Sequence, residues 1–354
     1  MTQDLTGVAG ALVARGKGIL AADETPGTLG RRFEALGIAC TEESRRAYRE
    51  MLFTAPGAAE FISGVIMQDE TIRQRGSAGR PLAATLADQG ILPGVKVDAG
   101  ARPIAGSPTE TVTEGLDGLR ERLAEYHRLG ARFAKWRAVI KIGEALPSRM
   151  CVAANAHALA RYAALSQEQG LVPIVEPEVL MDGDHTLERC EAVTGQVLHA
   201  VFEALDEQGV ALEAMLLKPN MVVSGDECAE DASVAEVAAA TLRCLRRCVP
   251  AAAPGIVFLS GGQDARLATL HLDAINRAPG PKPWAISFSY GRALQDDALQ
   301  AWHGRDEGLA AGGQALAHRA RCNSAACLGT YTDELEQTLF TVRAGAPGRA
   351  LRDD

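Results

Sequence analysis

Lysines are scarce in this chain, and their scarcity makes them candidates for chemistry. Only six of the 36 basic residues are lysines. An arginine keeps its proton in a protein, whereas a lysine amine can lose its proton and attack a carbonyl carbon to form a Schiff base. Four of the six lysines lie in apolar, strand-like runs, where a charge is costly unless it is paired or used; they are Lys96, Lys135, Lys141 and Lys218. A biased composition would explain any single one of them.

Lys218 is the preferred nucleophile. It stands in MLLKPNMVV, which carries no other charge, so its own segment offers dry surroundings and little stabilisation of an ammonium by anions. Lys135, near Arg137 in FAKWRAVIKIG, is better placed as the neighbouring cation that favours a neutral amine on its partner. We therefore expect Lys218 to attack the substrate and Lys135 to assist it.

Three carboxylates accompany the lysines. Glu176 and Glu178 stand two residues apart in LVPIVEPEV, and Asp23 lies near the end of GILAADE. A pair of carboxyl groups, one protonated and one ionised, is what general acid and base catalysis requires when a carbinolamine loses water. The same two glutamates would also balance the charges of Lys135 and Arg137, and the two roles are compatible.

Two glycine-bearing loops predict a phosphate site. SGGQ and SYGR follow strand-like runs and supply hydroxyl groups, backbone N–H groups and an arginine; their candidate residues are Ser260, Gly261, Gly262, Ser289, Gly291 and Arg292. A second anion site is expected in TPGTLGRR, with Thr25, Thr28, Arg31 and Arg32. Ordinary turn chemistry is the alternative for each loop. Taken together, the two sites predict a doubly anionic sugar as the ligand.

Eight strand-like runs can bring these residues to one end of a barrel. The runs span residues 18–24, 62–70, 92–100, 133–143, 171–179, 215–223, 255–262 and 284–292, with helical patterns between them. Eight such units without a linker predict an α/β fold, a single (β/α)8 TIM barrel that takes in residues 1–354 as one domain. Further helices are expected over about 293–327, and a C-terminal tail from about 329. In such barrels the site lies at the carboxyl ends of the strands.

Charge and composition exclude several classes of function. The net charge of −9 has the wrong sign for a surface that binds nucleic acid. No run of about 18 apolar residues is available to span a membrane, and MTQDLTGVAG lacks the basic segment of a signal peptide, so we expect a cytoplasmic protein. The eight cysteines form no CxxC motif and are interpreted as reduced thiols, with Cys244 and Cys248 on a buried helix face. The histidines form no HxH or HExxH motif, so we expect neither a metal nor another cofactor.

Together these segments resemble the class I fructose-1,6-bisphosphate aldolases of animal and plant type. The motifs that carry the resemblance are GKGILAADE, GVKVDAG, FAKWRAVIKIGE, LLKPNM, FLSGGQ and WAISFSYGRALQ, and the similar stretch runs from about Gly16 to Tyr331. The resemblance implies a metal-free, reversible cleavage of fructose 1,6-bisphosphate into dihydroxyacetone phosphate and glyceraldehyde 3-phosphate. It also implies a homotetramer.

The resemblance further implies roles for individual residues. Lys218 matches the Schiff-base lysine, and Lys135 matches the lysine that stabilises the carbinolamine. Glu176 matches the carboxyl group that moves protons during imine formation, with Glu178 beside it, and Asp23 matches the aspartate that assists at the C4 hydroxyl. The C1-phosphate pocket is implied at Ser260, Gly261, Gly291 and Arg292, with Ser289 next to it, and the other phosphate at Thr25, Thr28 and Arg32. Gly262 and Arg137 complete the expected substrate-binding set.

Three positions depart from the family pattern. Ala99 replaces the usual lysine before Gly100, which removes a cation near the second phosphate. Thr25 and Pro26 replace a Ser-Thr pair, and the last tyrosine is Tyr331, whereas many members end in a tyrosine that helps to protonate the enamine. A Schiff-base aldolase for another ketose phosphate, such as fructose 1-phosphate or sedoheptulose 1,7-bisphosphate, is therefore an alternative. A non-catalytic barrel that binds sugar phosphates is a second one.

Overall fold

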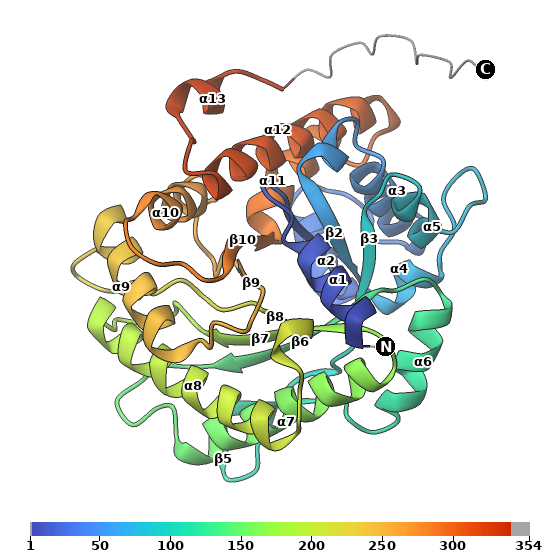
Figure 1. Ribbon diagram of the computed structural model, residues 1–354. Helices are drawn as coiled ribbons and strands as arrows, with labels where there is room; N and C mark the ends of the chain where they lie inside the picture. The colour runs from blue at the N-terminus through green and yellow to red at the C-terminus, as the bar shows by residue number, and fades with distance from the viewer. Residues whose placement is uncertain (1, 341–354) are drawn as a thin grey trace, which may run out of the picture.

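Eight parallel strands close into a barrel in the computed structural model, which describes residues 2–340 (Figure 1). Around the barrel the order is β1, β10, β9, β8, β7, β6, β3 and β2. The barrel strands are β1 (Gly18–Ala22), β2 (Ile62–Met67), β3 (Leu92–Lys96), β6 (Phe133–Ile140), β7 (Val172–Val179), β8 (Leu216–Leu217), β9 (Gly255–Phe258) and β10 (Ala285–Tyr290). The predicted barrel is confirmed, although each strand is shorter than the run that predicted it.

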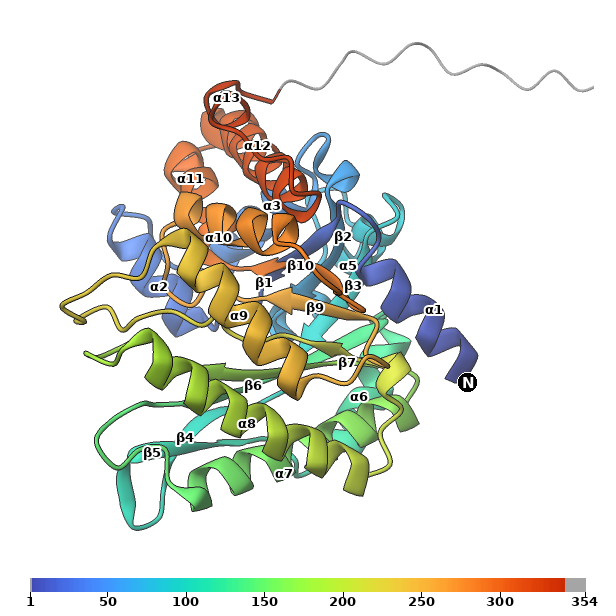
Figure 2. The same ribbon diagram turned by 60° about the vertical axis from the view of Figure 1, so that its left-hand side comes forward.

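Helices surround the barrel, most of them on its outer side, and α1 lies across one end (Figures 1 and 2). They are α1 (Thr2–Leu12), α2 (Pro26–Glu34), α3 (Glu42–Phe53), α4 (Asp69–Arg73), α5 (Leu82–Ala87), α6 (Leu119–Arg128), α7 (Arg149–Glu168), α8 (Leu187–Glu207), α9 (Val234–Cys248), α10 (Ala265–Arg277), α11 (Arg292–Trp302), α12 (Leu309–Cys327) and α13 (Asp333–Gln337). The helices expected after β10 are α11 and α12; the predicted tail begins before α13, and its part beyond residue 340 lies outside the described residues. None of the helices described here is long and apolar enough to cross a membrane.

Side-chain caps set the beginning of the long outer helices. Ser148, Thr186, Ser233 and Asp264 each accept a hydrogen bond from a backbone N–H group in the first turn of α7, α8, α9 and α10, respectively. Each cap stands in the connection that follows a barrel strand. It therefore helps to fix the direction in which the chain leaves the mouth of the barrel.

Alternation along the strands divides the barrel interior into an apolar layer and a charged layer. Phe133 and Lys135 on β6, and Ile174 and Glu176 on β7, are each two residues apart and so face the same side of the sheet. Phe133 and Ile174 belong to one buried apolar cluster that includes Leu12 of α1. Helix α1 thus covers the amino-terminal end of the barrel (Figure 2). The charged residues follow the apolar ones along the strands and so stand at the other end.

One segment differs from the sequence prediction. A β-hairpin of β4 (Gly100–Ile104) and β5 (Ser107–Glu114) lies between β3 and α6, outside the barrel. The helical pattern over 113–130 predicts a helix from its start, but α6 begins only at Leu119. Gly115 and Gly118 adopt φ angles of 124° and 64°, which are left-handed conformations that a helix does not contain and that glycine tolerates.

Packing inside the barrel leaves no room for a side chain at Gly94, the glycine of β3. A Cβ atom added at Gly94 would lie 2.2 Å from ring carbons of Phe133, which is fully buried. We expect Gly94→Ala to lower the free energy of unfolding by about 1–3 kcal/mol, because the ring cannot move away without disturbing its neighbours. Urea unfolding followed by circular dichroism measures this loss.

Gly10→Ala in α1 is the matched control, since nothing lies within 4 Å of its added Cβ. It should leave stability unchanged or raise it by up to about 1 kcal/mol through helix propensity. Equal unfolding midpoints for the two variants would contradict this account of the packing.

Candidate active site

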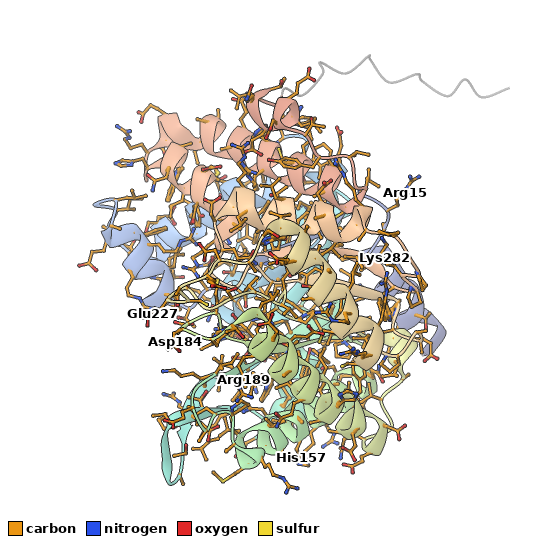
Figure 3. The ribbon with its side chains drawn as sticks, turned by 90° about the vertical axis from the view of Figure 1, so that its left-hand side faces the viewer. Arg15, His157, Asp184, Arg189, Glu227 and Lys282 are labelled. Atoms are coloured by element: carbon orange, nitrogen blue, oxygen red, sulfur yellow. The ribbon has the colours of Figure 1, made fainter. Side chains whose placement is uncertain are left out.

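A cavity of about 690 Å³ opens at the carboxyl ends of the barrel strands. Every residue predicted for the site lines it, namely Asp23, Thr25, Thr28, Arg31, Arg32, Lys135, Arg137, Glu176, Glu178, Lys218, Ser260, Gly261, Gly262, Ser289, Gly291 and Arg292. Asp184 and Glu227, from the loops after β7 and β8, lie near each other at this end of the molecule, and Arg15 lies at the other end (Figure 3). The fold thus brings together residues that are far apart in the sequence.

A shared carboxylate joins the two central lysines. Glu176 Oε1 lies 3.1 Å from Lys218 Nζ, and Glu176 Oε2 lies 2.8 Å from Lys135 Nζ. Asp23 Oδ2 contacts the same Lys135 ammonium at 2.9 Å. The side chains of Lys135, Lys218 and Glu176 are each 4% exposed, so this cluster of charges is almost out of contact with water.

Burial and pairing act in opposite directions on these groups. Burial by itself would raise the pKa of Asp23 and Glu176 and would lower the pKa of Lys135. Pairing outweighs burial: the ammonium groups of Lys135 and Lys218 hold the pKa of both carboxyls below its usual range. The carboxylates of Asp23 and Glu176 in turn hold the pKa of Lys135 above its usual range. Asp23, Glu176 and Lys135 are therefore charged near neutral pH.

The surroundings of Lys218 differ in one respect from the prediction. Its own segment is apolar and buried, and β8 ends before it because Pro219 has no N–H group with which to continue the ladder. The neighbouring strand β7, however, places the Glu176 carboxylate against the Lys218 amine. The sequence predicts one protonated and one ionised carboxyl group in the pair of Glu176 and Glu178. Glu176 is an ionised one.

Further ion pairs extend the charged layer. Arg137 on β6 pairs with Glu178 on β7, as the charge-balance interpretation predicts. Lys96 Nζ lies 3.0 Å from Asp98 Oδ1. Lys96 and Glu24 also line the cavity, outside the set predicted for the site. Their signal was present in the GVKVDAG and AADE motifs, but only the closed barrel shows that these charges face the same space as Lys218.

The loops after β9 and β10 offer donors for an anion. Ser289 Oγ is buried and has no hydrogen-bond partner among the described residues. Gly262 has a φ of 91°, which glycine tolerates, and Arg292 lies close to it, since a Cβ added there would lie 3.7 Å from Arg292 Nη2. Helix α11 begins at Arg292, which adds the positive end of a helix dipole. These groups suit a phosphate.

The other predicted anion site is partly occupied by the protein's own groups. The Thr25 hydroxyl caps α2, where it accepts a hydrogen bond from Thr28 N at 3.2 Å and donates one to Thr28 Oγ1 at 3.1 Å. Arg32 pairs with Glu24 at 2.8 Å and with Asp296 at 2.9 Å. The positive charge of this site is therefore lower than the sequence alone suggests.

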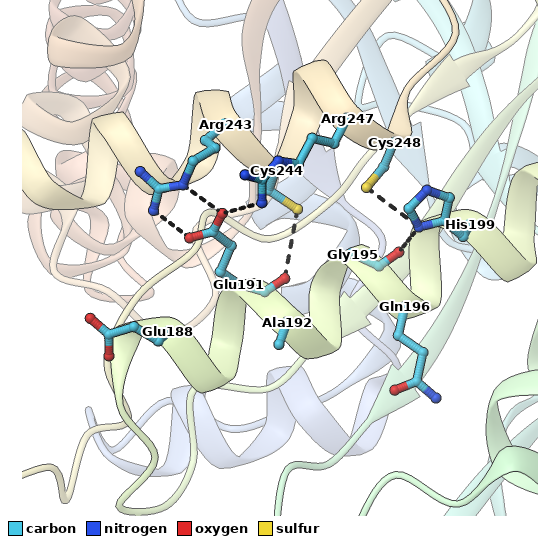
Figure 4. A pocket seen from close by; sticks show the side chains of 10 residues that line it. All are labelled: Glu188, Glu191, Ala192, Gly195, Gln196, His199, Arg243, Cys244, Arg247 and Cys248. Carbon is cyan, nitrogen blue, oxygen red and sulfur yellow. Dashed lines mark hydrogen bonds and ion pairs between the residues drawn. The ribbon is translucent and has the colours of Figure 1, made fainter.

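A second cavity, of about 550 Å³, lies between α8 and α9 (Figure 4). In it Cys248 Sγ lies 3.7 Å from His199 Nδ1, and Cys244 Sγ lies 3.9 Å from the carbonyl oxygen of Glu191. Both cysteines are free and buried on one helix, as predicted, and burial raises the pKa of both thiols. Within residues 2–340, no group of three or more His, Cys, Asp or Glu side chains is arranged to hold a metal ion.

A closed barrel whose charged layer lies at the carboxyl ends of its strands defines the class of this protein as a (β/α)8-barrel enzyme. The family model of the glycolytic class-I fructose-bisphosphate aldolases matches residues 4–343. The chain is 57% identical to a probable fructose-bisphosphate aldolase class 1 from Xanthomonas campestris. The aligned 330 residues cover 93% of this chain and 98% of that relative. It is 51% identical over 344 residues to fructose-bisphosphate aldolase B from Gallus gallus, with coverage of 95% and 94%.

A solved structure of fructose-bisphosphate aldolase from Plasmodium falciparum shares the fold. Its TM-score is 0.92 at 48% sequence identity, and the match covers 94% of this chain and 96% of that one. The chain therefore belongs to the class-I fructose-bisphosphate aldolase family, as its motifs indicated, and it is a carbon–carbon lyase.

The Lys135 ammonium should contribute more to stability at neutral than at acidic pH. Lys135→Met leaves Asp23 and Glu176 buried without the cation that both contact, and we expect a loss of about 3 kcal/mol at pH 7. The depressed pKa of Asp23 stabilises the fold above its unfolded value of about 3.9, and this contribution disappears as the pH falls towards the folded pKa. The difference in stability between wild type and variant should therefore begin to shrink below about pH 4 and should continue to shrink as the pH falls further.

Lys141→Met is the control for this experiment, because Lys141 is an exposed lysine just beyond the same strand. It should change the free energy of unfolding by less than about 0.5 kcal/mol at any pH. Urea midpoints measured at pH 7 and at several pH values from about 4 down to about 2 test both variants. A loss in Lys135→Met that does not depend on pH would disprove the role given to this ion pair.

Proposed function

We propose that this protein cleaves fructose 1,6-bisphosphate reversibly into dihydroxyacetone phosphate and glyceraldehyde 3-phosphate through a Schiff base on Lys218. One observation carries the proposal: the Glu176 carboxylate contacts both Lys218 and Lys135 inside a cavity that also holds donors for phosphate. A lysine amine with an adjacent proton acceptor can condense with a ketone. The resulting iminium accepts the electron pair of a neighbouring carbon–carbon bond.

Glu176 moves the protons of imine formation in this proposal. The Lys218 amine must be neutral when it attacks C2 of the ketose, and Glu176 Oε1 lies within hydrogen-bond distance to accept its proton. The same carboxyl group then protonates the carbinolamine hydroxyl, which leaves as water. Lys135 remains an ammonium and stabilises the carbinolamine oxygen by its charge.

Asp23 acts on the carbon–carbon bond. When it takes the proton of the C4 hydroxyl, the C3–C4 electron pair flows to the iminium, which becomes an enamine, and the aldehyde product leaves. Asp23 is ionised, lines the cavity and lies beside Lys135, so it is available for this step. Protonation of the enamine carbon and hydrolysis of the imine then release the second triose and the free amine.

The two phosphates hold the sugar in place. We assign the C1 phosphate to the loops after β9 and β10, where Ser289 has a free hydroxyl and Arg292 adjoins Gly262. The distal phosphate is assigned to the loop after β1, with Thr25, Thr28 and Arg32. The remaining substrate-binding residues are Arg137, Ser260, Gly261 and Gly291, with Glu178 beside Arg137. Fixed phosphates would keep C2 of the ketose near Lys218.

We further propose that the protein is a homotetramer in the cytoplasm, without a nucleic-acid or membrane partner. The tetramer rests on the resemblance to the family, and the location on a relative from Arabidopsis thaliana that is named as cytosolic and is 49% identical. The net charge of −9 disfavours a nucleic-acid partner. Sedimentation equilibrium should show a particle about four times the chain mass of 37.3 kDa, and a stable monomer would reject the tetramer.

One observation favours a second substrate, fructose 1-phosphate. Arg32 is paired with two carboxylates, and Ala99 stands where the family usually has a lysine, so of these positions near the distal phosphate only Arg31 offers an unpaired cation among the described residues. A weak distal site reduces the advantage of a bisphosphate over a monophosphate. A large loss of kcat/KM for fructose 1-phosphate relative to fructose 1,6-bisphosphate would favour the bisphosphate as the substrate.

Reductive trapping tests the Schiff base. Borohydride added with dihydroxyacetone phosphate should reduce the imine to a stable secondary amine and inactivate the enzyme, and mass spectrometry should locate the adduct on Lys218. Lys218→Met should abolish both labelling and turnover, because methionine has no amine. Lys141→Met, an exposed-lysine control, should retain both. Activity that EDTA abolishes, with no adduct on any lysine, would reject the mechanism.

A further inference from the structure

The guanidinium group of Arg32 is already bound to two carboxylates. Its Nη1 lies 2.8 Å from Glu24 Oε1, and its Nη2 lies 2.9 Å from Asp296 Oδ1. Nη1 also donates a hydrogen bond to Gln295 Oε1 at 3.3 Å. A phosphate group that binds Arg32 must therefore share this cation with a carboxylate or displace one.

Glu24 also binds other residues of the site, so displacing its carboxylate from Arg32 would cost much free energy. Its Oε2 lies 2.8 Å from Arg49 Nη1, and its Oε1 accepts a hydrogen bond from Gln295 Nε2 at 2.9 Å. The Arg49 side chain is 2% exposed, and Glu24 is its only ion-pair partner among the described residues. Removing the Glu24 carboxylate would leave a buried guanidinium unpaired, which costs several kcal/mol.

Asp296 is placed differently. It lies on α11, its side chain is 55% exposed, and within the described part of the chain its one ion pair is with Arg32. Removing its charge leaves Arg32 paired with Glu24 and leaves no buried charge alone. A pair with one exposed partner, whose other partner keeps a second carboxylate, contributes little to stability. The Asp296 carboxylate can therefore affect ligand binding without being required for the fold.

We propose that Asp296 is a specificity-determining residue that weakens binding of the distal phosphate. It thereby lowers the ratio of kcat/KM for a ketose bisphosphate to kcat/KM for a ketose monophosphate. The inference rests on the proposed function, which brings the distal phosphate to Arg32. A phosphate at Arg32 meets the Asp296 carboxylate as a competitor for the same donor and as a like charge nearby. Only a substrate with a distal phosphate experiences this competition.

The test compares two ketoses on charge-removing variants. Asp296→Asn keeps the size of the side chain, and Asp296→Ala also removes the acceptor. Each should lower KM for fructose 1,6-bisphosphate roughly three- to tenfold, because Arg32 Nη2 loses its carboxylate partner and can bind phosphate while Nη1 stays paired with Glu24. For fructose 1-phosphate, kcat and KM should change less than about twofold. High salt should reduce the effect of the Asp296 substitutions on KM for the bisphosphate, because this effect is electrostatic.

Asp297→Asn is the matched control, because it removes the same charge from the next residue of α11. Its carboxylate lies 3.8 Å from Arg319, a residue that does not line the cavity. The ratio of kcat/KM for the two ketoses should stay at the wild-type value in this variant. An equal gain in Asp297→Asn would show that net charge alone acts, and would overturn the inference.

Two results separate this inference from the proposed function. If the wild type forms the borohydride adduct and cleaves the bisphosphate, but both Asp296 variants keep the wild-type substrate ratio, the inference alone is wrong. The same holds if both substrates gain equally. If the wild type forms no adduct and cleaves neither ketose, the proposed function fails and the inference fails with it.

Discussion

The site depends on one carboxylate that two buried ammonium groups share. Lys135 and Lys218 could not be held out of water alone, and Glu176, with Asp23, offsets the cost of burying them. The carboxylate that contacts Lys218 also provides this lysine with a proton acceptor. A proton that passes from Lys218 to Glu176 changes an ion pair into a neutral pair, so the net charge of the cluster stays the same. Balanced charge thus serves both stability and the proposed chemistry.

The barrel makes this arrangement possible by separating two layers along the same strands. Apolar inward residues such as Phe133 and Ile174 fill the end that α1 covers, and two residues later the same strands present Lys135 and Glu176. The apolar layer excludes water from below, which strengthens the ion pairs above it. The open end leaves one direction of approach for a substrate. Stability and reactivity therefore occupy opposite ends of one interior.

Compensation of charge extends from the centre of the cavity to its rim. Lys96, Arg137 and Arg32 each have a carboxylate partner, so the basic residues of the site do not add up to a strongly positive surface. Arg31 and Arg292 line the cavity without an ion-pair partner among residues 2–340. A phosphorylated ligand has to compete with the protein's own carboxylates at the paired sites. Arg32, where the distal phosphate is expected, has two carboxylate partners.

The sequence by itself determined the order of strands and helices, the residues at the strand ends and the family. These features are local, because strand runs, caps and motifs such as LLKPNM can be recognised without knowing what lies beside them. It did not reveal the hairpin before α6, where two glycines interrupt a helical pattern. It also did not reveal that Glu176 contacts Lys218 or that Asp296 contacts Arg32. Only closure of the barrel decides such pairs, since the partners come from different strands and helices and their protonation depends on the charges that the closed barrel brings within about 3 Å.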